Sequence, residues 1–404
     1  MEMKPFKRLL SRDEAMEIIT ANIKRIERLE TVPLEEASGR VLAEDAVAGF
    51  NVPPFNRSAM DGYAVKAQDT FGGSNFNPRR LKLVGVEHAG ERFEGNVGSG
   101  ECLQVATGSV IPEGADSVVM VENTRQAGDY VEVFQPVYPA ANVSPEGEDI
   151  KRGDVVVKGG DFLVPGKIGA IAALGITAIK VLAKPVISVI STGTEVRPLG
   201  IELMPGQIYD INSYTLNAII SSNGGVPIMH DIIPDEPEAL RTALREGAER
   251  DMIVLSGGSS VGARDLLYEA VDELGEVLFH GVHVKPGKPT LFGLVGEKPV
   301  FGMPGNPTSC LSNAYLFLVP ALRTAAGLPK ADLRQVRAEM ASRVVASSGR
   351  EQFLTVRMEG GKAHPVFKKS GAITSMTHAD GYIVLPVNVD VIEEGEIVTV
   401  TMFN

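Results

Sequence analysis

The sequence predicts a multidomain protein of the α/β plus β class, with a central, mainly parallel α/β domain and two mostly β modules. Strand-like and helix-like segments alternate from about residue 184 to 328, which is the pattern of βαβ units. Short apolar runs in a stretch rich in Gly, Pro and Asn occupy about 47 to 149, and short alternating strands return after about 330. The length of 404 residues suits about two to four domains.

The N-terminal segment predicts an amphipathic helix. Ser11 and Glu14 have the spacing of a capping box, in which each side chain accepts a hydrogen bond from the other residue's backbone N–H. Apolar residues then recur at helical steps on one face, at Ile19, Ile23, Ile26 and Leu29. In the first β module we predict strands at 81–86, at 118–121 and around 130–133, and residues 154–175 join this module to the central domain.

The central domain alternates strands and helices. The predicted strands are 186–190, 226–233, 252–255, 277–283 and 300–302, and the predicted helices are 213–222, 237–249, 265–274 and 308–326. Helical connections of this length favour a mainly parallel sheet. The C-terminal module is predicted to contain strands at 353–358, 382–385 and 397–402.

Composition excludes several classes of protein. The 39 Lys and Arg against 51 Asp and Glu give a net charge of −12, which repels a phosphate backbone, so we expect no nucleic acid partner. Two cysteines, Cys102 and Cys310, are too few for a disulfide framework or a zinc site built from Cys. Because neither a signal peptide nor a long apolar span is visible, we expect a soluble cytoplasmic protein with no membrane partner.

Loops after the predicted parallel strands carry the candidate chemistry, because ligands of open parallel sheets bind beyond the carboxyl ends of the strands. Glycines in these loops let backbone N–H groups approach an anion, and Lys285 and Lys288 supply positive charge. Glu195, Asp235 and Asp265 are suited to hold Mg²⁺ against phosphate oxygens. Five loops together predict a phosphate or oxyanion site, namely residues 191–195, 234–236, 256–262, 285–289 and 303–309.

Each of these features alone has a structural alternative. A Gly-Gly pair after a strand is also typical of a tight turn, and Asp235, two residues before Pro237, also suits a helix cap. The lysines could equally be solvated. It is their coincidence at one edge of the sheet that favours an anion site.

Better-defined nucleotide-binding and catalytic motifs do not explain these loops. Residues 285–290 lack the first glycine of a Walker loop, and no GxGxxG follows a strand, which disfavours a nicotinamide cofactor. Cys310 could form a nucleophile with His280 or His283, although a small buried thiol is the simpler interpretation. Residues 53–64 predict a rigid loop that presents Arg57, Ser58 and Asp61, or a purely structural turn.

Several segments occur in the order typical of one known family. They are FNRSAMDGYA (55–64), ATGSVIPEGADSVVM (106–120), GEDI (147–150), STGTE (191–195), SGGSSVG (256–262), KPGKP (285–289), GMPGNP (302–307) and residues 371–386. With them the sequence resembles the molybdopterin molybdenumtransferase family, which includes MoeA and the E-domain of gephyrin. The resemblance spans essentially the whole chain.

The resemblance implies four domains. They are an extended linking domain at 27–46 and 150–182, an inserted β domain at 47–149, a molybdopterin-binding α/β domain at 1–26 and 183–329, and a C-terminal β-barrel at 330–404. It also implies a homodimer in which each site lies between the α/β domain of one subunit and the inserted β domain of the other, so that Asp61 would act in trans.

The implied reaction inserts molybdate, or the closely similar tungstate, into the dithiolene of adenylylated molybdopterin and releases AMP with the help of Mg²⁺. The catalytic candidates are Asp61, Glu195, Asp235, Asp265, Lys285 and Lys288, of which Glu195, Asp235 and Asp265 would hold the metal. The cofactor-binding candidates, from the family positions and the strand-end loops together, are Thr107, Asp149, Thr192, Gly193, Ser256, Gly257, Gly258, Pro304, Ser309, Arg350 and Ser375.

Two other functions remain open at this point: a molybdopterin adenylyltransferase, and a non-catalytic molybdopterin-binding scaffold. The inserted β domain, the C-terminal module and the SAMDGYA loop argue against the first, and the complete set of loop residues argues against the second. An adenylyltransferase and molybdoenzymes are the expected partners in the pathway.

Overall fold

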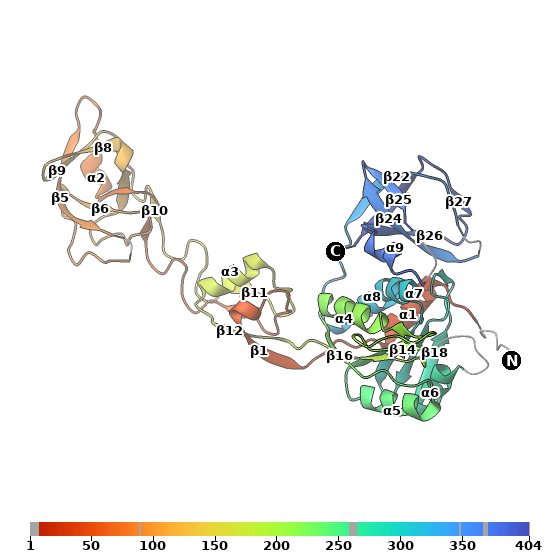
Figure 1. Ribbon diagram of the computed structural model, residues 1–404. Helices are drawn as coiled ribbons and strands as arrows, with labels where there is room; N and C mark the ends of the chain where they lie inside the picture. Colours follow the sequence, from red (N-terminus) through yellow and green to blue (C-terminus); the bar gives the residue numbers. More distant parts are fainter. Residues whose placement is uncertain (1–7, 89, 258–264, 347–348, 367–370, 404) are drawn as a thin grey trace. The chain divides into compact units, whose positions relative to one another are not determined.

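The computed structural model describes residues 8–88, 90–257, 265–346, 349–366 and 371–403. The chain divides into two compact units, whose elements are labelled in Figure 1. The α/β unit comprises Met1–Glu30, Gly39–Val41 and Val181–Asn404, and the β unit comprises Thr31–Ser38 and Leu42–Lys180. No helix among the described residues is both long enough and apolar enough to cross a lipid bilayer.

A six-stranded sheet forms the centre of the α/β unit, in the order β16–β13–β17–β21–β20–β18. Its strands are β13 (Val186–Ser191), β16 (Val226–Met229), β17 (Met252–Ser256), β18 (Gly275–His280), β20 (Leu291–Val295) and β21 (Lys298–Met303). Strands β16, β13, β17 and β21 are parallel, and β20 is antiparallel to both of its neighbours. The predicted mainly parallel sheet is confirmed. The strand β20 was not predicted; it forms a hairpin with β21, so no helix separates the two.

Helices cover both faces of this sheet (Figure 1). On one face lie α1 (Arg12–Asn22), α4 (Asn212–Ser222), α7 (Pro307–Asn313) and α8 (Val319–Ala325), and on the other lie α5 (Pro237–Gly247) and α6 (Leu266–Leu274). Alternation along β13 shows why both faces are buried. Ile187 and Val189 pack in the first layer, whereas Ile190 packs with α5 and α6 in the second.

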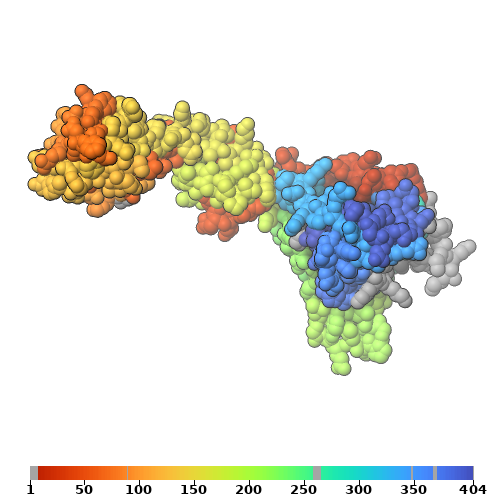
Figure 2. Space-filling model, turned by 90° about the horizontal axis from the view of Figure 1, so that it is seen from above, coloured from red at the N-terminus to blue at the C-terminus, as the bar shows by residue number. Residues whose placement is uncertain are grey.

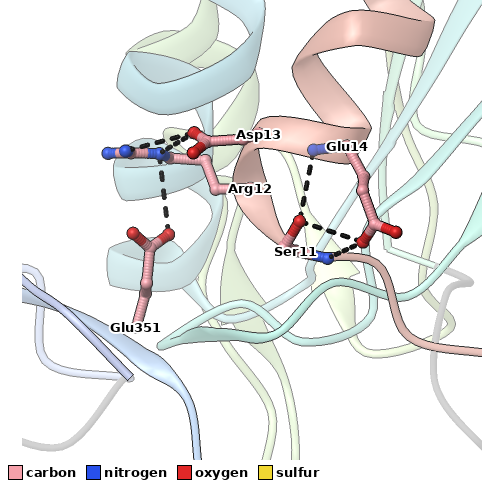
Figure 3. Close-up of polar contacts among 5 residues, drawn as sticks. All are labelled: Ser11, Arg12, Asp13, Glu14 and Glu351. Atoms are coloured by element: carbon pink, nitrogen blue, oxygen red, sulfur yellow. Dashed lines mark hydrogen bonds and ion pairs between the residues drawn. The ribbon is translucent and has the colours of Figure 1, made fainter. Parts of the chain in front are cut away.

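The capping box of α1 is confirmed (Figure 3). The Ser11 hydroxyl accepts from the Glu14 N–H at 3.2 Å, and the Glu14 carboxylate accepts from the Ser11 N–H at 2.8 Å. The helix is shorter than predicted, because the backbone is extended at Ile23. The Ile26 N–H instead donates to the carbonyl of Ala325 at the end of α8, so a tertiary hydrogen bond replaces the helical one.

The long helix predicted at 308–326 is interrupted. A π-helical segment, η3 (Ala314–Leu318), lies between α7 and α8. Pro320 lacks the N–H that an α-helix would direct to the carbonyl four residues earlier, and the turn before it is wider. Such π segments are frequent near functional sites, so the end of α7 is a candidate for a functional role.

A closed five-stranded barrel forms the C-terminal part of the α/β unit. Its strands are β22 (Gln335–Met340), β24 (Glu351–Glu359), β25 (Lys362–Pro365), β26 (Gly381–Leu385) and β28 (Ile397–Met402). The order β24–β25–β22–β28–β26 is closed by pairing of β24 with β26. The short strands β23 (Val344–Val345) and β27 (Val391–Ile392) pair beside the barrel, and α9 (Thr374–Thr377) precedes β26.

Aromatic side chains attach this barrel to the helices of the same unit. The rings of Phe353 and Tyr382 stack with centroids 4.3 Å apart, and Tyr382 lies 6.2 Å from Tyr315 of η3. Figure 2 shows the C-terminal segment, in blue, lying against the rest of this unit. The barrel therefore shares a continuous hydrophobic core with the sheet and its helices.

The centre of the β unit is a second six-stranded sheet, in the order β7–β4–β6–β5–β9–β8. Its strands are β4 (Gly62–Val65), β5 (Arg79–Glu87), β6 (Glu101–Val105), β7 (Ser117–Met120), β8 (Thr124–Ala127) and β9 (Tyr130–Val133). Tyr63 and Val65 pack in one hydrophobic cluster and Ala64 in another, so this sheet also has two buried faces. The strands predicted in this region are confirmed.

Shorter elements complete the chain. They are β1 (Leu29–Pro33) paired with β12 (Ala178–Leu182), β2 (Ala46–Val47) with β11 (Val155–Val157), β3 (Arg57–Ser58) with β10 (Val143–Ser144), η1 (Leu34–Glu36), α2 (Ala67–Thr70), η2 (Val121–Asn123) and α3 (Pro165–Ala173). Two further strands of the α/β unit, β14 (Val196–Arg197) and β15 (Ile208–Tyr209), pair with each other, and β19 (Val284–Lys285) pairs with β24.

The ion pair of Arg28 and Asp251 gives a first testable prediction. Two hydrogen bonds of 2.6 and 2.7 Å join the side chains, and the Val186 N–H also donates to Asp251 at 2.7 Å. Burial raises the pKa of Asp251, but these donors outweigh burial and hold the pKa below its ordinary value. A carboxylate with a lowered pKa stabilises the fold above its unfolded pKa, and this stabilisation is lost as the pH falls through the folded value.

We therefore expect Asp251→Asn to lower the free energy of unfolding at neutral pH by about 1–2 kcal/mol, a modest value because Arg28 is half exposed. The difference from the wild type should shrink as the pH falls below the ordinary Asp value of about 3.9. Urea denaturation across this range measures it. A difference that is the same at every pH would contradict the assignment.

Candidate active site

A cavity of about 1010 Å³ lies at the carboxyl ends of the parallel strands of the α/β unit. Its walls include residues from every predicted loop: 191–195 after β13, Asp235, 256–257 after β17, 285–289 after β19, and 304–309 after β21. The predicted site residues among its walls are Thr192, Gly193, Glu195, Asp235, Ser256, Gly257, Lys285, Lys288, Pro304, Ser309 and Arg350. The sheet and the C-terminal barrel of this unit thus bring together residues that are up to 158 positions apart in the sequence, from Thr192 to Arg350.

Among the described residues, three cationic side chains line the cavity: Lys285, Lys288 and Arg350. The parallel pairing of β19 with β24 sets Lys285 opposite Gln352, so the register fixes Lys285 close to the start of the strand that follows Arg350. The first residue of β24, Glu351, faces Arg12 of α1, whose Nε lies 3.6 Å from the carboxylate (Figure 3). Helix α1 thereby contacts the strand pair that contains Lys285 and directly follows Arg350.

Within the part of the chain that the structure describes, three carboxylates line the same cavity: Glu195, Asp210 and Asp235. Asp235 accepts a hydrogen bond from the Thr192 hydroxyl, which follows β13. The alternative function of Asp235 as a helix cap is wrong, because the N-cap of α5 is Glu236 and no side chain caps this helix. Both lysines and carboxylates therefore line one cavity, as an anion site with an accompanying cation requires.

Asp265 lies at the start of α6. It is the N-cap of α6, where its carboxylate accepts from the Tyr268 N–H at 3.1 Å. Its other oxygen lies 3.1 Å from Nε2 of His280, and burial raises the pKa of Asp265 and lowers the pKa of His280. Asp265 is not among the described residues that line the cavity. Gly258 lies outside the described residues, as do the positions from 259 to 264.

Ser375 is also displaced from the cavity wall. It is fully buried in α9, where its hydroxyl donates to the Ala372 carbonyl at 2.9 Å and lies 3.4 Å from the Thr308 hydroxyl. Thr308 precedes Ser309, which does line the cavity. Ser375 therefore supports the start of α7 in this structure.

The remaining predicted residues lie in the β unit. Asp61 accepts hydrogen bonds from the backbone N–H and the hydroxyl of Thr107, at 2.7 and 2.9 Å. These two donors lower the pKa of Asp61 below its ordinary value, so the carboxylate is ionised at neutral pH. Asp149 is exposed, and its N–H donates to the Val52 carbonyl at 3.1 Å.

The cysteine alternative is wrong. Cys310 has no exposed surface, and burial, together with the nearby carboxylate of Asp210, raises the pKa of its thiol. A buried thiol that stays protonated is a poor nucleophile. Cys310 is therefore a small core residue of α7.

Three family models match the chain over nearly its whole length. They are the MoeA N-terminal region (domain I and II) at residues 10–175, the "Probable molybdopterin binding domain" at 188–324, and the MoeA C-terminal region (domain IV) at 337–403. The chain belongs to the MoeA family. The resemblance inferred from the sequence motifs is thus confirmed.

Relatives and solved structures agree with this assignment. A protein of Methanocaldococcus jannaschii named for molybdopterin biosynthesis is 35% identical over 412 residues, which cover 98% of this chain and 99% of that protein. The molybdopterin molybdenumtransferase of Staphylococcus aureus is 33% identical over 88% of this chain and 87% of its own. The structure of the MoeA molybdopterin biosynthesis protein from Pyrococcus horikoshii matches with a TM-score of 0.85 and 40% identity, over 98% of this chain and 100% of that one. Members of the MoeA family are transferases of molybdenum cofactor biosynthesis, and so is this chain.

Sequence reasoning missed one wall of the cavity in this MoeA-family chain. Ile208, Tyr209, Asp210, Ile211 and Asn212 line it, at the end of β15 and the start of α4. Asp210 accepts from the Ser213 N–H at 3.0 Å, and Asn212 donates to the Gly305 carbonyl at 2.9 Å. The signal was present, because a helix that follows a strand of a parallel sheet begins at the same edge as the strand's carboxyl end.

Proposed function

We propose that this MoeA-family enzyme inserts molybdate into adenylylated molybdopterin and releases AMP. The observation that carries the proposal is the single cavity that contains Lys285, Lys288 and Arg350 together with Asp235 and Glu195. Molybdate is a tetrahedral dianion, so these cations and the Ser309 hydroxyl are suited to bind its oxygens. The volume of about 1010 Å³ is at the upper end for small-molecule sites, which suits a ligand as large as an adenylylated pterin.

Magnesium fits the donor set of this cavity. Mg²⁺ is usually held by one or two carboxylates together with water and substrate phosphates. Asp235 and Glu195 would hold it in this way, although the described residues contain no group of three His, Cys, Asp or Glu arranged for a metal. When bound, the ion supplies Lewis-acid activation of the phosphoanhydride. Asp265 as a third ligand stays a prediction.

The chain's own residues then have separate tasks. Lys285 and Lys288 bind and orient the oxyanion, and the glycine turns at Gly193 and Gly257 leave room for phosphate oxygens to approach the backbone. The Thr192 hydroxyl, by donating to Asp235, holds that carboxylate in place. The dithiolene sulfurs that receive molybdenum belong to the substrate.

We further propose a cytoplasmic homodimer with the site shared between subunits. Three residues of the β unit of one subunit would complete the site of the other subunit, namely Asp61, Thr107 and Asp149. The ionised Asp61, already held by Thr107, is suited to such a role. An adenylyltransferase would supply the substrate, and molybdoenzymes would receive the product.

An assay of the purified chain tests this function. We expect AMP to be released from adenylylated molybdopterin only when molybdate and Mg²⁺ are both present, with EDTA abolishing release, and the product to activate a cofactor-free molybdoenzyme. Chromatography of the nucleotides measures AMP. Adenylylation of molybdopterin from ATP would indicate the adenylyltransferase instead, and ligand binding without turnover would indicate the scaffold.

A further inference from the structure

Asn313 joins helix α7 to the loop that carries both cavity lysines. It is the last residue of α7 and has no exposed surface. Its Nδ2 donates to the Gly287 carbonyl at 2.7 Å and to the Thr290 hydroxyl at 2.5 Å. The Thr290 hydroxyl in turn donates to the same Gly287 carbonyl at 2.9 Å. A buried carbonyl in the middle of the lysine loop thus receives two donors.

The lysine loop and the Asn313 amide fit each other closely. Gly287 has φ +112°, a conformation that L-residues with a side chain rarely adopt. A Cβ atom at this position would lie 2.3 Å from Nδ2 and 2.5 Å from Oδ1 of Asn313. Because glycine leaves this space open, the amide reaches the backbone between Lys285 and Lys288.

Helix α7 also contributes directly to the cavity. Ser309, which lines the cavity, precedes Asn313 by four residues, so the two side chains lie on one face of the helix. One rigid element therefore places a cavity hydroxyl and fastens the loop of the cavity lysines. The relative positions of Ser309, Lys285 and Lys288 depend on this connection.

We propose that Asn313 is a positioning residue, which holds Lys285 and Lys288 where they bind the oxyanion substrate. The inference rests on the proposed function, because it names the residue that fixes the geometry of the same site. Asn313 touches neither substrate nor reacting atoms and acts through the Gly287 carbonyl. Its Oδ1 accepts no hydrogen bond within the described part of the chain, so donation is the polar contribution of this amide.

Variants of Asn313 separate positioning from folding. Asn313→Ala removes both donors, and we expect it to raise the KM and the Kd for molybdate about ten- to hundredfold, with a smaller fall in kcat. Ser312→Ala is the matched control, because Ser312 is equally buried in α7 but donates only to the Ser309 carbonyl of its own helix. The control should leave the KM for molybdate unchanged. Calorimetric titration with molybdate and steady-state AMP release measure these quantities, and thermal melting reports stability.

Asn313→Asp adds a test that a structural role does not predict. Its carboxylate repels the Gly287 carbonyl, whereas its protonated form regains an O–H donor. Since burial raises a carboxyl pKa, we expect the molybdate affinity of this variant to recover as the pH falls from about 8 to about 6, relative to the wild type.

The experiments distinguish failure of the positioning role of Asn313 from failure of the proposed reaction. If the wild type binds molybdate but releases no AMP, while Asn313→Ala weakens molybdate binding, the positioning role stands and the proposed reaction falls. If the wild type releases AMP and both Asn313 variants keep the wild-type KM and Kd for molybdate, the positioning role is overturned. A fall in melting temperature alone, with unchanged KM, also overturns it.

Discussion

Lys288→Ala should lower the rate of molybdate insertion by about 10²–10³-fold, the effect typical of removing one charged or hydrogen-bonding group from a preorganised site. Lys288 lines the cavity with Lys285 and Arg350, in a chain whose net charge is −12. An oxyanion that enters this cavity exchanges its hydration shell for contacts with fixed cations. Water does not compensate for the loss of one of these cations. Lys285→Ala should have a similar effect.

The fold should tolerate this change. The Lys288 carbonyl accepts hydrogen bonds from the N–H groups of Val282 and Thr290, and alanine keeps this backbone pattern. A suitable control is Lys24→Ala, which removes a lysine whose side chain is 81% exposed and paired only with the exposed Glu297 among the described contacts. We expect that control to retain full activity. AMP release measures activity, and circular dichroism measures folding. Normal cofactor synthesis by Lys288→Ala would contradict the assigned role of Lys288 in binding the oxyanion.

Gly287→Ala should be a strongly damaging small substitution in the cavity. The added Cβ would collide with the Asn313 amide, and φ +112° would strain any residue with a side chain. We expect a loss of about 2–4 kcal/mol in the free energy of unfolding, from overpacking and backbone strain together. The displaced loop should also lose molybdate binding.

Gly296→Ala separates the two causes of that loss. Gly296 has φ +60°, but a Cβ there meets no atom within 4 Å, so only the backbone preference is changed. We expect a cost of about 1 kcal/mol and normal molybdate affinity for this variant. Urea denaturation and molybdate titration compare the pair. Equal effects of the two substitutions would mean that contact with Asn313 is unimportant.

The carboxylates illustrate how far sequence reasoning reaches. Asp235 and Asp265 both come after a predicted strand, and the sequence assigns both of them to metal binding, with capping as the alternative for Asp235. In the structure Asp235 lines the cavity and leaves its helix uncapped, whereas Asp265 caps α6 and faces His280. The two aspartates differ because Asp235 contacts Thr192 and Asp265 contacts His280, which belong to other segments of the sheet. The sequence around each aspartate does not indicate these contacts.

The fold shows the same limit. The capping box of Ser11 and Glu14 is local and was predicted correctly, and the apolar run of β13 and the alternation within β9 are local as well. The end of α1 was misplaced because Ile26 bonds to the distant Ala325. Pattern and propensity therefore predict elements well until a tertiary hydrogen bond competes with the helical one.

Burial of both thiols has a consequence for metal handling. The chain has two cysteines, and both lack exposed surface; burial raises the pKa of Cys102 to about 12 and keeps Cys310 protonated as well. Thiolates are soft ligands that would capture a metal destined for another molecule. Because its own thiols are buried and protonated, the proposed enzyme has no thiolate that would compete with the dithiolene of the substrate for the metal. For the same reason, we expect alkylating reagents to leave its turnover unchanged.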